Sequence, residues 1–389
     1  MRILMAHNFY QQPGGEDQSF AAESGLLERY GHTVFRYEVR NTDIVGRNFA
    51  SLAIDTVWNQ STYSKIRKII REEGIEIAHF QNTFPIMSPS VYHAARAEGV
   101  PVIQSLRNYR LLCPNALFFR DGHVCEDCMH SLIPWPSIYH GCYRDSRAVT
   151  GVTASMLVTH RILRTWTQTI DCYIALTEFS KNKFIEGGLP ANKIIVKPNF
   201  VLSDPGIGIG DGSFALFVGR LTSEKGVETL LSAWQSIGRH LPLKIAGDGP
   251  LASVVEKAVE HNPAIEWLGY QSSTEILALM KRAHLLIFPS QWYEGFPRVI
   301  VEAYAVGLPV IASNIGSMSS LILHKRTGLH FQSGNVEDLV EQVMWVCEHP
   351  QDYQEMRRAA RVEFESKYTA EQNYRMMMDV YAFARRNLQ

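Results

Sequence analysis

Short apolar segments alternate with amphipathic helical patterns along most of the chain. The first series, typical of buried strands, occupies residues 2–6, 33–37, 75–80, 100–106, 171–176 and 194–197. A second series follows at residues 214–218, 243–246, 265–268, 285–288 and 309–312. Each segment of the second series precedes a turn and a helical pattern, and strands that alternate with helices predict parallel sheets covered on both faces. The chain is therefore expected to be an α/β protein.

Two regions interrupt this alternation. Proline, cysteine and aromatic residues are concentrated at residues 110–150, whereas residues 198–212 are rich in glycine and proline and show little periodicity. The second region is interpreted as a linker between two domains. The predicted organisation is a Rossmann-like domain at residues 1–198, a second one at 199–365 and a terminal helical segment at 366–389.

The composition is that of a globular protein and argues against several classes of function. The 389 residues are 46% hydrophobic and 20% charged with a net charge of -1, so no global attraction to nucleic acid or to an anionic membrane is expected. Residues 1–10 lack the pattern of a signal peptide, and no run of about 18 uncharged apolar residues occurs. A cytoplasmic protein without a spanning helix is therefore predicted.

Two loops of the second predicted domain have the features of a phosphate-binding site. In the segment 219–226 a glycine ends the strand, and Arg220 and Lys225 precede a helix. The fork of an arginine and the point charge of a lysine both suit a diphosphate, and the helix start adds amide donors. The turn 247–250 contains glycines that allow close approach of a ligand. The alternative for both loops is a solvated turn with surface charges.

Two carboxylates follow the strand predicted at residues 285–288. Glu294 lies in the turn after this strand, and Glu302 lies about two helical turns later in an otherwise apolar helix. A buried carboxylate is costly without partners, and it can accept two hydroxyl donors from a polyol such as ribose or hexose. The two residues therefore indicate a carbohydrate contact. The alternative is one acid at a helix start and a second acid on the surface.

The spacing of Glu294 and Glu302 is one of several motifs that together point to a known family. The chain closely resembles the retaining glycosyltransferases of family 4, which have the GT-B fold of two Rossmann-like domains that face each other across a cleft. The resemblance covers nearly the whole chain and implies that the terminal helix returns to the first domain. It rests on the segments 14–16, 218–226, 246–250, 294–303 and 307–312.

The resemblance implies a role for four side chains of the second domain. Arg220 and Lys225 would hold the diphosphate of a nucleotide-sugar donor, a UDP- or GDP-sugar, and stabilise the leaving group. Glu302 would accept from the ribose hydroxyls, and Glu294 would accept from hydroxyls of the transferred sugar. Enzymes of this family transfer with retention at the anomeric carbon and need no catalytic metal.

Loops on both domains would complete the donor site in the same resemblance. Gly14 and Gly15 would let a loop of the first domain approach the diphosphate. The backbone at Gly295 and Phe296 would present amides to the sugar or the phosphate, and Tyr270 would lie near the base.

Two positions depart from the pattern of the family. Arg107 stands where many relatives have a histidine that contacts the donor sugar, and an arginine cannot act as a base near neutral pH. It is expected to bind a phosphate, or a carboxylate if the donor is a uronic acid. Pro297 lacks the amide that many relatives offer at its position. His79 resembles histidines beside the acceptor site of relatives, with a structural role as the alternative.

A cysteine cluster lies in the irregular region. Four thiolates within one stretch suit a tetrahedral structural zinc site, which would stabilise a region poor in regular structure. Buried cysteines that only pack are the alternative. The candidate ligands are Cys113, Cys125, Cys128 and Cys142.

Aromatic and basic residues are mixed further along the first domain. In relatives this domain binds the acceptor, frequently a lipid-linked sugar at the inner face of the membrane, and an aromatic and basic surface suits that location. Ordinary helix packing with solvated arginines is the alternative. The residues concerned are Trp135, Tyr139, Tyr143, Arg144, Arg147, His160, Arg161, Arg164 and Trp166.

The sequence, with its resemblance, predicts a retaining hexosyltransferase that acts in cell-surface polysaccharide synthesis. It would move a sugar from a nucleotide-sugar donor to a glycan or to a lipid-linked oligosaccharide. The protein would be cytoplasmic, with a peripheral contact at the inner membrane face, and would bind no nucleic acid. Two alternatives stay open, a sugar-nucleotide epimerase or hydrolase on the same fold and a non-catalytic nucleotide-sugar-binding subunit. The binding-subunit alternative is supported by one feature, Arg107 at the position of the histidine in relatives.

Overall fold

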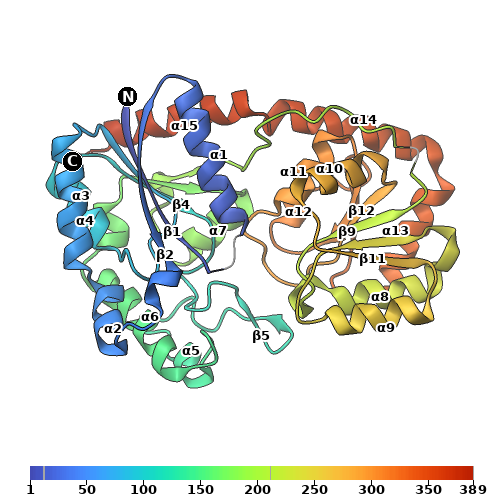
Figure 1. The fold of residues 1–389 in the computed structure, drawn as a ribbon, viewed down its shortest axis with the longest axis horizontal. Coiled ribbons are helices and arrows are strands. Elements are labelled where there is room, and N and C mark those ends of the chain that lie inside the picture. The colour runs from blue at the N-terminus through green and yellow to red at the C-terminus, as the bar shows by residue number, and fades with distance from the viewer. Residues whose placement is uncertain (12–13, 211, 389) are drawn as a thin grey trace. The chain divides into compact units, whose positions relative to one another are not determined.

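The chain forms two compact units, each built on one six-stranded parallel sheet (Figure 1). The computed structural model describes residues 1–11, 14–210 and 212–388. Unit 1 comprises Met1–Phe118, Glu126–Asn199 and Asn373–Gln389. Unit 2 comprises Phe119–Cys125 and Phe200–Gln372. The α/β class with two Rossmann-like units, predicted from the alternation of strands and helices, is confirmed.

The sheet of unit 1 reverses its strand order next to its first strand. Its strands are β1 (Arg2–Phe9), β2 (Thr33–Arg40), β3 (Ile77–Phe80), β4 (Val102–Leu106), β7 (Cys172–Ala175) and β8 (Ile194–Val196). They run parallel in the order β2-β1-β3-β4-β7-β8, so the chain leaves β1 towards β2 and then returns to the other side of β1. Ligands of open α/β sheets bind at the carboxyl ends of the strands, beside such a switch in order.

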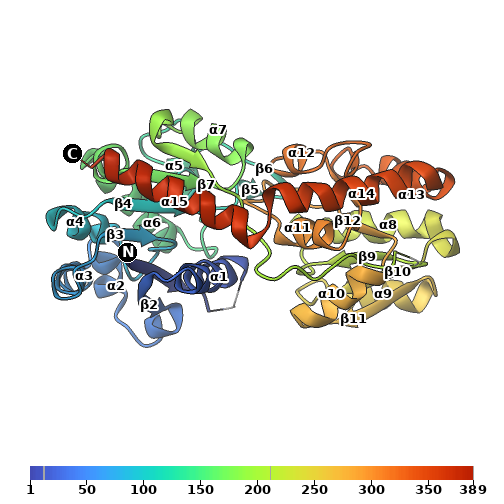
Figure 2. The ribbon, with the colours of Figure 1, turned by 90° about the horizontal axis from the view of Figure 1, so that it is seen from above.

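Helices bury both faces of this sheet. They are α1 (Gly15–Arg29), α2 (Phe49–Val57), α3 (Gln60–Glu72), α4 (Ser90–Ala97), α5 (Trp135–His140), α6 (Arg147–Ile162), α7 (Glu178–Glu186) and α15 (Ala370–Arg386). Ile3, Met5 and Ile103 pack with α1 and α15 on one face. Phe80 contacts Tyr92 of α4 on the other face, with ring centroids 5.2 Å apart. Figure 2 shows α15, at the far end of the chain, running along the strands of unit 1.

The sheet of unit 2 has the same plan. Its strands are β9 (Ala215–Val218), β10 (Leu243–Ala246), β11 (Ile265–Gly269), β12 (Leu285–Phe288), β13 (Val310–Ser313) and β14 (Gly328–Phe331). They run parallel in the order β11-β10-β9-β12-β13-β14, so the strand order switches between β9 and β12. Strand β14 was missed in the sequence pattern because it begins with Gly328 and contains no β-branched residue.

Alternate residues of these strands face opposite layers of helices. The helices of unit 2 are α8 (Val227–Ile237), α9 (Ala252–His261), α10 (Ser273–Arg282), α11 (Arg298–Ala305), α12 (Met318–Leu321), α13 (Val336–Glu348) and α14 (Pro350–Lys367). Phe217 and Ile245 pack with α8, α9 and α13, whereas Leu216 and Ala246 pack with α10, α11 and α12. Figure 1 shows α8 and α9 on one side of this sheet and α10 and α11 on the other.

Two further features complete the fold. The irregular region contains a short antiparallel hairpin, β5 (Phe119–Arg120) with β6 (His123–Val124). Most of the linker predicted at residues 198–212 belongs to unit 2. Within it, the carbonyls of Gly208 and Ile209 accept from Arg357. Across the described ranges, no helix combines the length and the apolar character that crossing a bilayer requires.

Candidate functional site

The carboxyl edge of the unit 2 sheet gathers the loops that the sequence motifs occupy. Because all six strands are parallel, the loops after β9, β10, β12 and β13 emerge at one edge. The loops after β9 and β12 lie on either side of the switch in strand order, where ligands of such sheets bind. The site is therefore described from these loops outward.

Glycines allow the first two loops to touch. Leu221 in the loop after β9 donates its amide to the carbonyl of Asp248 in the loop after β10, at 3.0 Å. A Cβ on Gly247 would lie 1.9 Å from the carbonyl oxygen of Gly219, and one on Gly249 would lie 2.6 Å from that of Leu221. The sequence predicted that these glycines permit approach of a ligand. In this structure they permit approach of the neighbouring loop.

A third glycine joins the loop after β9 to the loop after β12. Gly226 has a φ of 70°, in the left-handed region that favours glycine, and precedes α8. A Cβ there would lie 2.0 Å from the carbonyl oxygen of Pro289. Gln291 also donates its amide to the carbonyl of Glu224 at 2.8 Å. The two loops that flank the switch in strand order therefore form one surface at the start of α8.

An ion pair occupies this surface. Lys225 Nζ lies 2.5 Å from Glu294 Oε1, which also accepts from Ser290 Oγ at 2.8 Å and from Trp292 Nε1 at 2.8 Å. Glu294 is 6% exposed. Lys225 Nζ also lies 5.3 Å from the centroid of the Trp292 indole, a cation–π distance. The predicted cation, Lys225, and the predicted sugar-binding carboxylate, Glu294, are thus in direct contact.

Glu302 lies on α11, one turn after Arg298. Arg298 Nε is 3.7 Å from Glu302 Oε1. Burial raises the pKa of Glu302 above its ordinary value, and Arg298 opposes this rise. Helix α11 begins after Pro297, which offers no amide, as the sequence indicated.

The remaining predicted donor residues of unit 2 lie at the same edge. Arg220 is exposed just after β9, and Tyr270 is 82% exposed just after β11. Gly295 and Phe296 form the turn before α11. The turn is fixed by Ser317, whose Oγ donates to the carbonyl of Glu294 at 2.8 Å.

In unit 1, the predicted glycine motif lies at the start of α1. Gly14 precedes the helix with φ -136° and ψ -179°, and Gly15 is its first residue. The carboxylate of Asp17 accepts a hydrogen bond from the amide of Gly14 at 2.9 Å, and its other oxygen lies 2.7 Å from His7 Nε2. A Cβ on Gly14 would meet nothing within 4 Å, so that side of the turn has open space. Gln12 and Pro13, the start of the predicted turn, lie outside the described residues.

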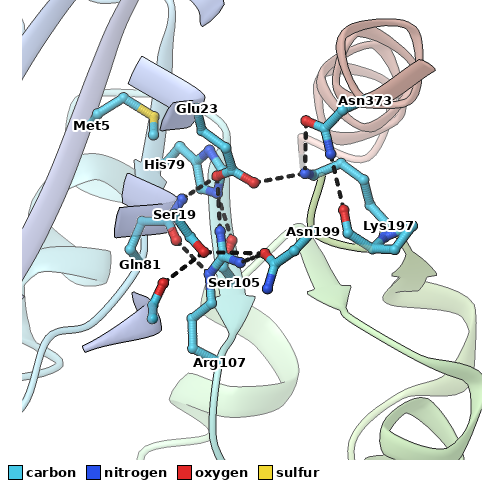
Figure 3. A network of polar contacts seen from close by, with 12 residues as sticks. Met5, Ser19, Glu23, His79, Gln81, Ser105, Arg107, Lys197, Asn199 and Asn373 are labelled. Carbon is cyan, nitrogen blue, oxygen red and sulfur yellow. Dashed lines mark hydrogen bonds and ion pairs between the residues drawn. The ribbon is translucent and has the colours of Figure 1, made fainter. Parts of the chain in front are cut away.

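Arg107, which the resemblance led us to expect as a ligand for a phosphate or a carboxylate, is buried inside unit 1 and also lines a pocket there. Its Nη2 lies 3.0 Å from Glu23 Oε2, its Nε donates to Gln81 Oε1 at 2.6 Å, and its Nη1 donates to Asn199 Oδ1. Lys197 Nζ lies 2.7 Å from the other oxygen of Glu23. Figure 3 shows Glu23 between the two cations. We call Glu23, Arg107 and Lys197 the buried charge cluster.

The buried charge cluster sets the protonation of its members. Burial raises the pKa of Glu23, but the charges of Arg107 and Lys197 outweigh it and hold that pKa well below the ordinary value. Burial lowers the pKa of the neighbouring His79 to about 3, so its ring is neutral near pH 7. His79 Nε2 lies 2.8 Å from Ser105 Oγ, and its Nδ1 lies 3.1 Å from the hydroxyl of Tyr381. The structural role considered for His79 is therefore the one that the structure supports.

A pocket opens beside this cluster, and a second pocket adjoins it. The first, here called the polar pocket, is lined in part by the polar and basic side chains of Gln81, Asn82, Arg107, Asn108 and Arg110 and by Trp166. The second, the apolar pocket, is lined mainly by apolar side chains of α2 and α6 and shares Thr56 and Phe84 with the first. Arg110 stands between the pockets, with its guanidinium 4.2 Å from the Phe84 ring centroid and 4.7 Å from that of Tyr143. Sequence reasoning missed Arg110 and the apolar pocket.

The aromatic and basic residues predicted as one surface differ in burial. Trp135 and Tyr139 are each 63% exposed on α5. Trp166 and His160 are buried, and burial lowers the pKa of His160 to about 4. Its ring nitrogens contact Thr165 Oγ1 and the carbonyl of Val57, both at 2.8 Å. These two residues belong to the core and not to a surface.

The four candidate zinc ligands do not form a metal site in the described residues. Over residues 1–11, 14–210 and 212–388, no group of three or more His, Cys, Asp or Glu side chains is arranged to hold a metal ion. Cys128 is buried, with its Sγ 3.9 Å from the carbonyl oxygen of Pro134. Spacing along the sequence does not fix where thiols point, and the predicted zinc site is not assembled in these residues. Its predicted ligands were Cys113, Cys125, Cys128 and Cys142.

Part of the chain is similar in sequence to known glycosyltransferases. Residues 206–363 match the family model described as Glycosyl transferases group 1. An uncharacterised glycosyltransferase of Methanocaldococcus jannaschii is 34% identical over 176 residues, which are 45% of this chain and 49% of that protein. Glycogen synthase of Mycobacterium tuberculosis is 34% identical over 177 residues, which are 44% of this chain and 42% of that protein. The chain thus matches less than half the length of these relatives.

A solved structure extends the likeness to the whole fold. HepE of Anabaena in complex with UDP superposes with a TM-score of 0.70 over 98% of this chain and 100% of that structure, at 15% identity. At this identity the likeness concerns the fold alone. It shows that the two Rossmann-like units are those of the GT-B fold.

Proposed function

We propose that this chain, whose residues 206–363 form a domain of the glycosyl transferases group 1 family, is a glycosyltransferase with a nucleotide-sugar donor. The observation that carries the proposal is the contact of Lys225 with Glu294 at the switch in strand order. A cation beside a carboxylate at this edge offers one group for a phosphate and one for sugar hydroxyls.

The donor would bind along the carboxyl edge of the unit 2 sheet. Lys225 and Arg220 would hold the diphosphate, and the start of α8 would add amide donors. Glu302 would accept from the ribose hydroxyls, and Glu294 from the transferred sugar. Tyr270 lies exposed after β11, where it would contact the base. We favour a UDP-sugar, since the structurally similar HepE was solved with UDP.

Charge changes during transfer explain why two cations are needed. The acceptor oxygen would form a bond to the anomeric carbon while the bond from that carbon to the diphosphate breaks. The leaving nucleoside diphosphate then gains negative charge, which Lys225 and Arg220 would stabilise more strongly than they stabilise the donor. Before the donor binds, Glu294 neutralises Lys225, so binding would exchange this partner for a phosphate.

Unit 1 would supply the acceptor site. Its polar pocket offers carboxamides, Arg110 and the Trp166 ring, which suit a saccharide or a phosphate. The adjoining apolar pocket suits a lipid chain, and therefore we propose a lipid-linked saccharide acceptor. Two exposed side chains, Phe49 at the apolar pocket (53%) and Trp135 on α5 (63%), favour a peripheral membrane contact.

The stereochemistry, the class of sugar and the biological role are proposed from the resemblance to the retaining glycosyltransferases of family 4. We propose a retaining hexosyltransferase that contributes to cell-surface polysaccharide synthesis at the inner membrane face. In this proposal Arg107 is not a ligand for the donor, because Glu23, Gln81 and Asn199 engage its guanidinium.

The direct test is calorimetric binding of UDP, GDP and ADP to the wild-type protein and to Lys225→Ala. We expect one nucleotide to bind best and Lys225→Ala to weaken it by about tenfold or more, as for a lost hydrogen bond to a charged group. The matched control is Lys244→Ala, which removes a lysine from the Lys244–Glu266 pair (2.7 Å) in the same unit. If a folded wild-type sample bound none of the three nucleotides, the donor site would be wrong. Equal weakening by both lysine variants would remove Lys225 from the site.

A further inference from the structure

The buried charge cluster lies where the chain enters and leaves unit 1. The chain passes to unit 2 after Asn199 and returns to unit 1 at Asn373. Asn199 Oδ1 accepts from Arg107 Nη1 and from Ser19 Oγ. Asn373 Oδ1 accepts from Lys197 Nζ at 3.2 Å. Each cation of the cluster therefore holds the carboxamide at one of the two crossings (Figure 3).

Glu23 joins the two cations. Its two oxygens pair with Arg107 at 3.0 Å and with Lys197 at 2.7 Å, and Gln81 donates to the oxygen that faces Arg107. The side chains of Glu23, Arg107 and Lys197 are at most 2% exposed. The cluster thus connects α1, the end of β4 and the end of β8 with the first residue of unit 1 on the returning segment.

The crossings are also joined to each other on both sides of the boundary. Within unit 1, Asn373 Nδ2 donates to the carbonyl of Pro198 at 2.9 Å. Within unit 2, the amide of Val201 donates to the carbonyl of Tyr368 at 3.0 Å. The two segments therefore form a double connection whose unit 1 end is fixed by side chains.

Stability alone is a weak reason for such a cluster. Removing charges from water is costly, and well-packed apolar residues can replace a buried ion network without loss of stability. The sheet face beside Glu23 is already apolar, with Phe20 and Leu27 of α1 packed on Ile3 and Met5. What the charges add is geometry, because each requires its partners at one distance and one direction.

We infer that Glu23 is a positioning residue, which holds Arg107 and Lys197 so that they fix both chain crossings to unit 1. Movement between the units is then confined to the segments beyond Asn199 and before Asn373. The cluster also reaches the polar pocket, since Gln81 and Arg107 line it. Given the proposed transferase function, loss of these contacts should lower kcat. It should leave the Kd for a nucleotide at the unit 2 site unchanged.

The test removes the anchored carboxamides and leaves the ions paired. Asn199→Ala and Asn373→Ala are compared with Asn262→Ala, which loses a carboxamide bonded to Trp234 and Ala264 in unit 2. Hydrogen exchange is followed at residues 197–201 and 371–374, together with kcat and the Kd for UDP. We expect faster exchange at both segments and a kcat lower by between about 2-fold and 30-fold, with an unchanged Kd. The control should alter neither segment nor kcat.

A conservative variant separates positioning from loss of packing. Asn199→Asp keeps an acceptor oxygen for Arg107, so it should restore wild-type exchange and kcat. Exchange that stays at the wild-type level in Asn199→Ala and Asn373→Ala would overturn the inference, as would a kcat no lower than that of the control. If the wild-type protein bound no nucleotide, the proposed function would fail, whereas the exchange measurement would still decide whether the crossings are anchored.

Discussion

The carboxyl edges of the two sheets carry similar charges in opposite settings. In unit 2, Lys225 follows strand β9 and pairs with Glu294, and its side chain is 21% exposed. In unit 1, Arg107 follows strand β4 and pairs with Glu23, and its side chain is 2% exposed. The first cation can reach a ligand by releasing its partner, whereas the second is enclosed.

The two cations differ in position, since Arg107 directly follows β4 and Lys225 lies just before α8, and they differ in their partners. Lys225 contacts one carboxylate, whose other neighbours Ser290 and Trp292 keep it in place when the lysine moves. Arg107 forms an ion pair with a carboxylate through Nη2 and donates to two carboxamides through Nε and Nη1. A cation at a strand end is thus a ligand group only when its own contacts leave it accessible.

The largest expected effect is the loss of stability when Glu23 is replaced, compared with the loss when Glu294 is replaced. Glu23→Gln leaves two cations buried without a counter-charge and should lower the free energy of unfolding by about 3–5 kcal/mol. Glu294→Gln should cost about 1 kcal/mol or less, because Lys225 can turn towards solvent. Urea unfolding of both variants measures the two losses. Equal losses would mean that the two pairs do not differ in the way their exposure indicates.

A nucleotide should distinguish the two edges by protection from hydrogen exchange. At a UDP concentration of 100 times Kd, binding stabilises the folded site by about 2.7 kcal/mol. We expect slower exchange in residues 219–226 and 289–297 of unit 2 and no change in residues 104–108 of unit 1. Lys225→Ala should reduce the protection at the same UDP concentration, and Lys244→Ala should not. Protection confined to unit 1 would reverse the assignment of the donor site.

Acid should lower the stability of unit 1 through His79. The pKa of His79 is lowered from 6.5 to about 3 by burial, with Glu23, Lys197 and Arg107 as its charged neighbours. The unfolded chain therefore takes up this proton at a higher pH than the folded chain does. Stability from this group is complete above pH 6.5 and decreases as the pH falls towards 3, by about 1.4 kcal/mol per pH unit.

The matched variant for this prediction is His79→Gln. It keeps a polar side chain near Ser105 and removes the titrating group, so the free energy of unfolding should depend less on pH between 6.5 and 5. His160, whose pKa burial lowers to about 4, should preserve part of the dependence. Urea midpoints at three pH values in this range provide the measurement. An unchanged slope in the variant would show that His79 does not titrate on unfolding.

The sequence predicted the fold because the fold depends on local patterns. Short apolar strands such as Leu285–Phe288, each followed by a helical period, required parallel sheets with helices on both faces. The strand β14 escaped detection because it begins with a glycine and contains no β-branched residue. The site of unit 2 was also predictable in part, since Lys225 and Glu294 lie in loops whose edge is set by the parallel strands.

The buried charge cluster was less accessible to sequence reasoning. Its members are 84 and 90 residues apart along the chain, from Glu23 to Arg107 and on to Lys197, and no local pattern pairs them. A signal existed nonetheless. Glu23 lies three residues after Phe20 and four before Leu27, so it falls on the apolar face of α1. A charged residue on a buried helix face requires a partner, but the sequence alone does not name it.

The smallest expected effect concerns Glu302 and sharpens the account of the donor edge. Burial raises the pKa of its carboxyl group, against the influence of Arg298, so it takes up a proton at a higher pH than an ordinary glutamate. If the carboxylate accepts from ribose hydroxyls, UDP affinity should weaken as the pH falls through that raised pKa. Glu302→Gln should weaken binding by about 1 kcal/mol near pH 7 and abolish this pH dependence.

Calorimetric titrations of UDP from pH 7.5 down to pH 5 check this prediction. The matched control is Glu266→Gln, which changes a carboxylate of the exposed Lys244 pair. The wild-type protein and the control should show the same decline in affinity, because Glu266 belongs to the Lys244 pair and does not lie on α11. If Glu302→Gln kept the wild-type pH dependence, the titrating group would lie elsewhere on the edge. Glu302 would then support α11 through Arg298, and the exposed loop with Lys225 would carry the nucleotide without it.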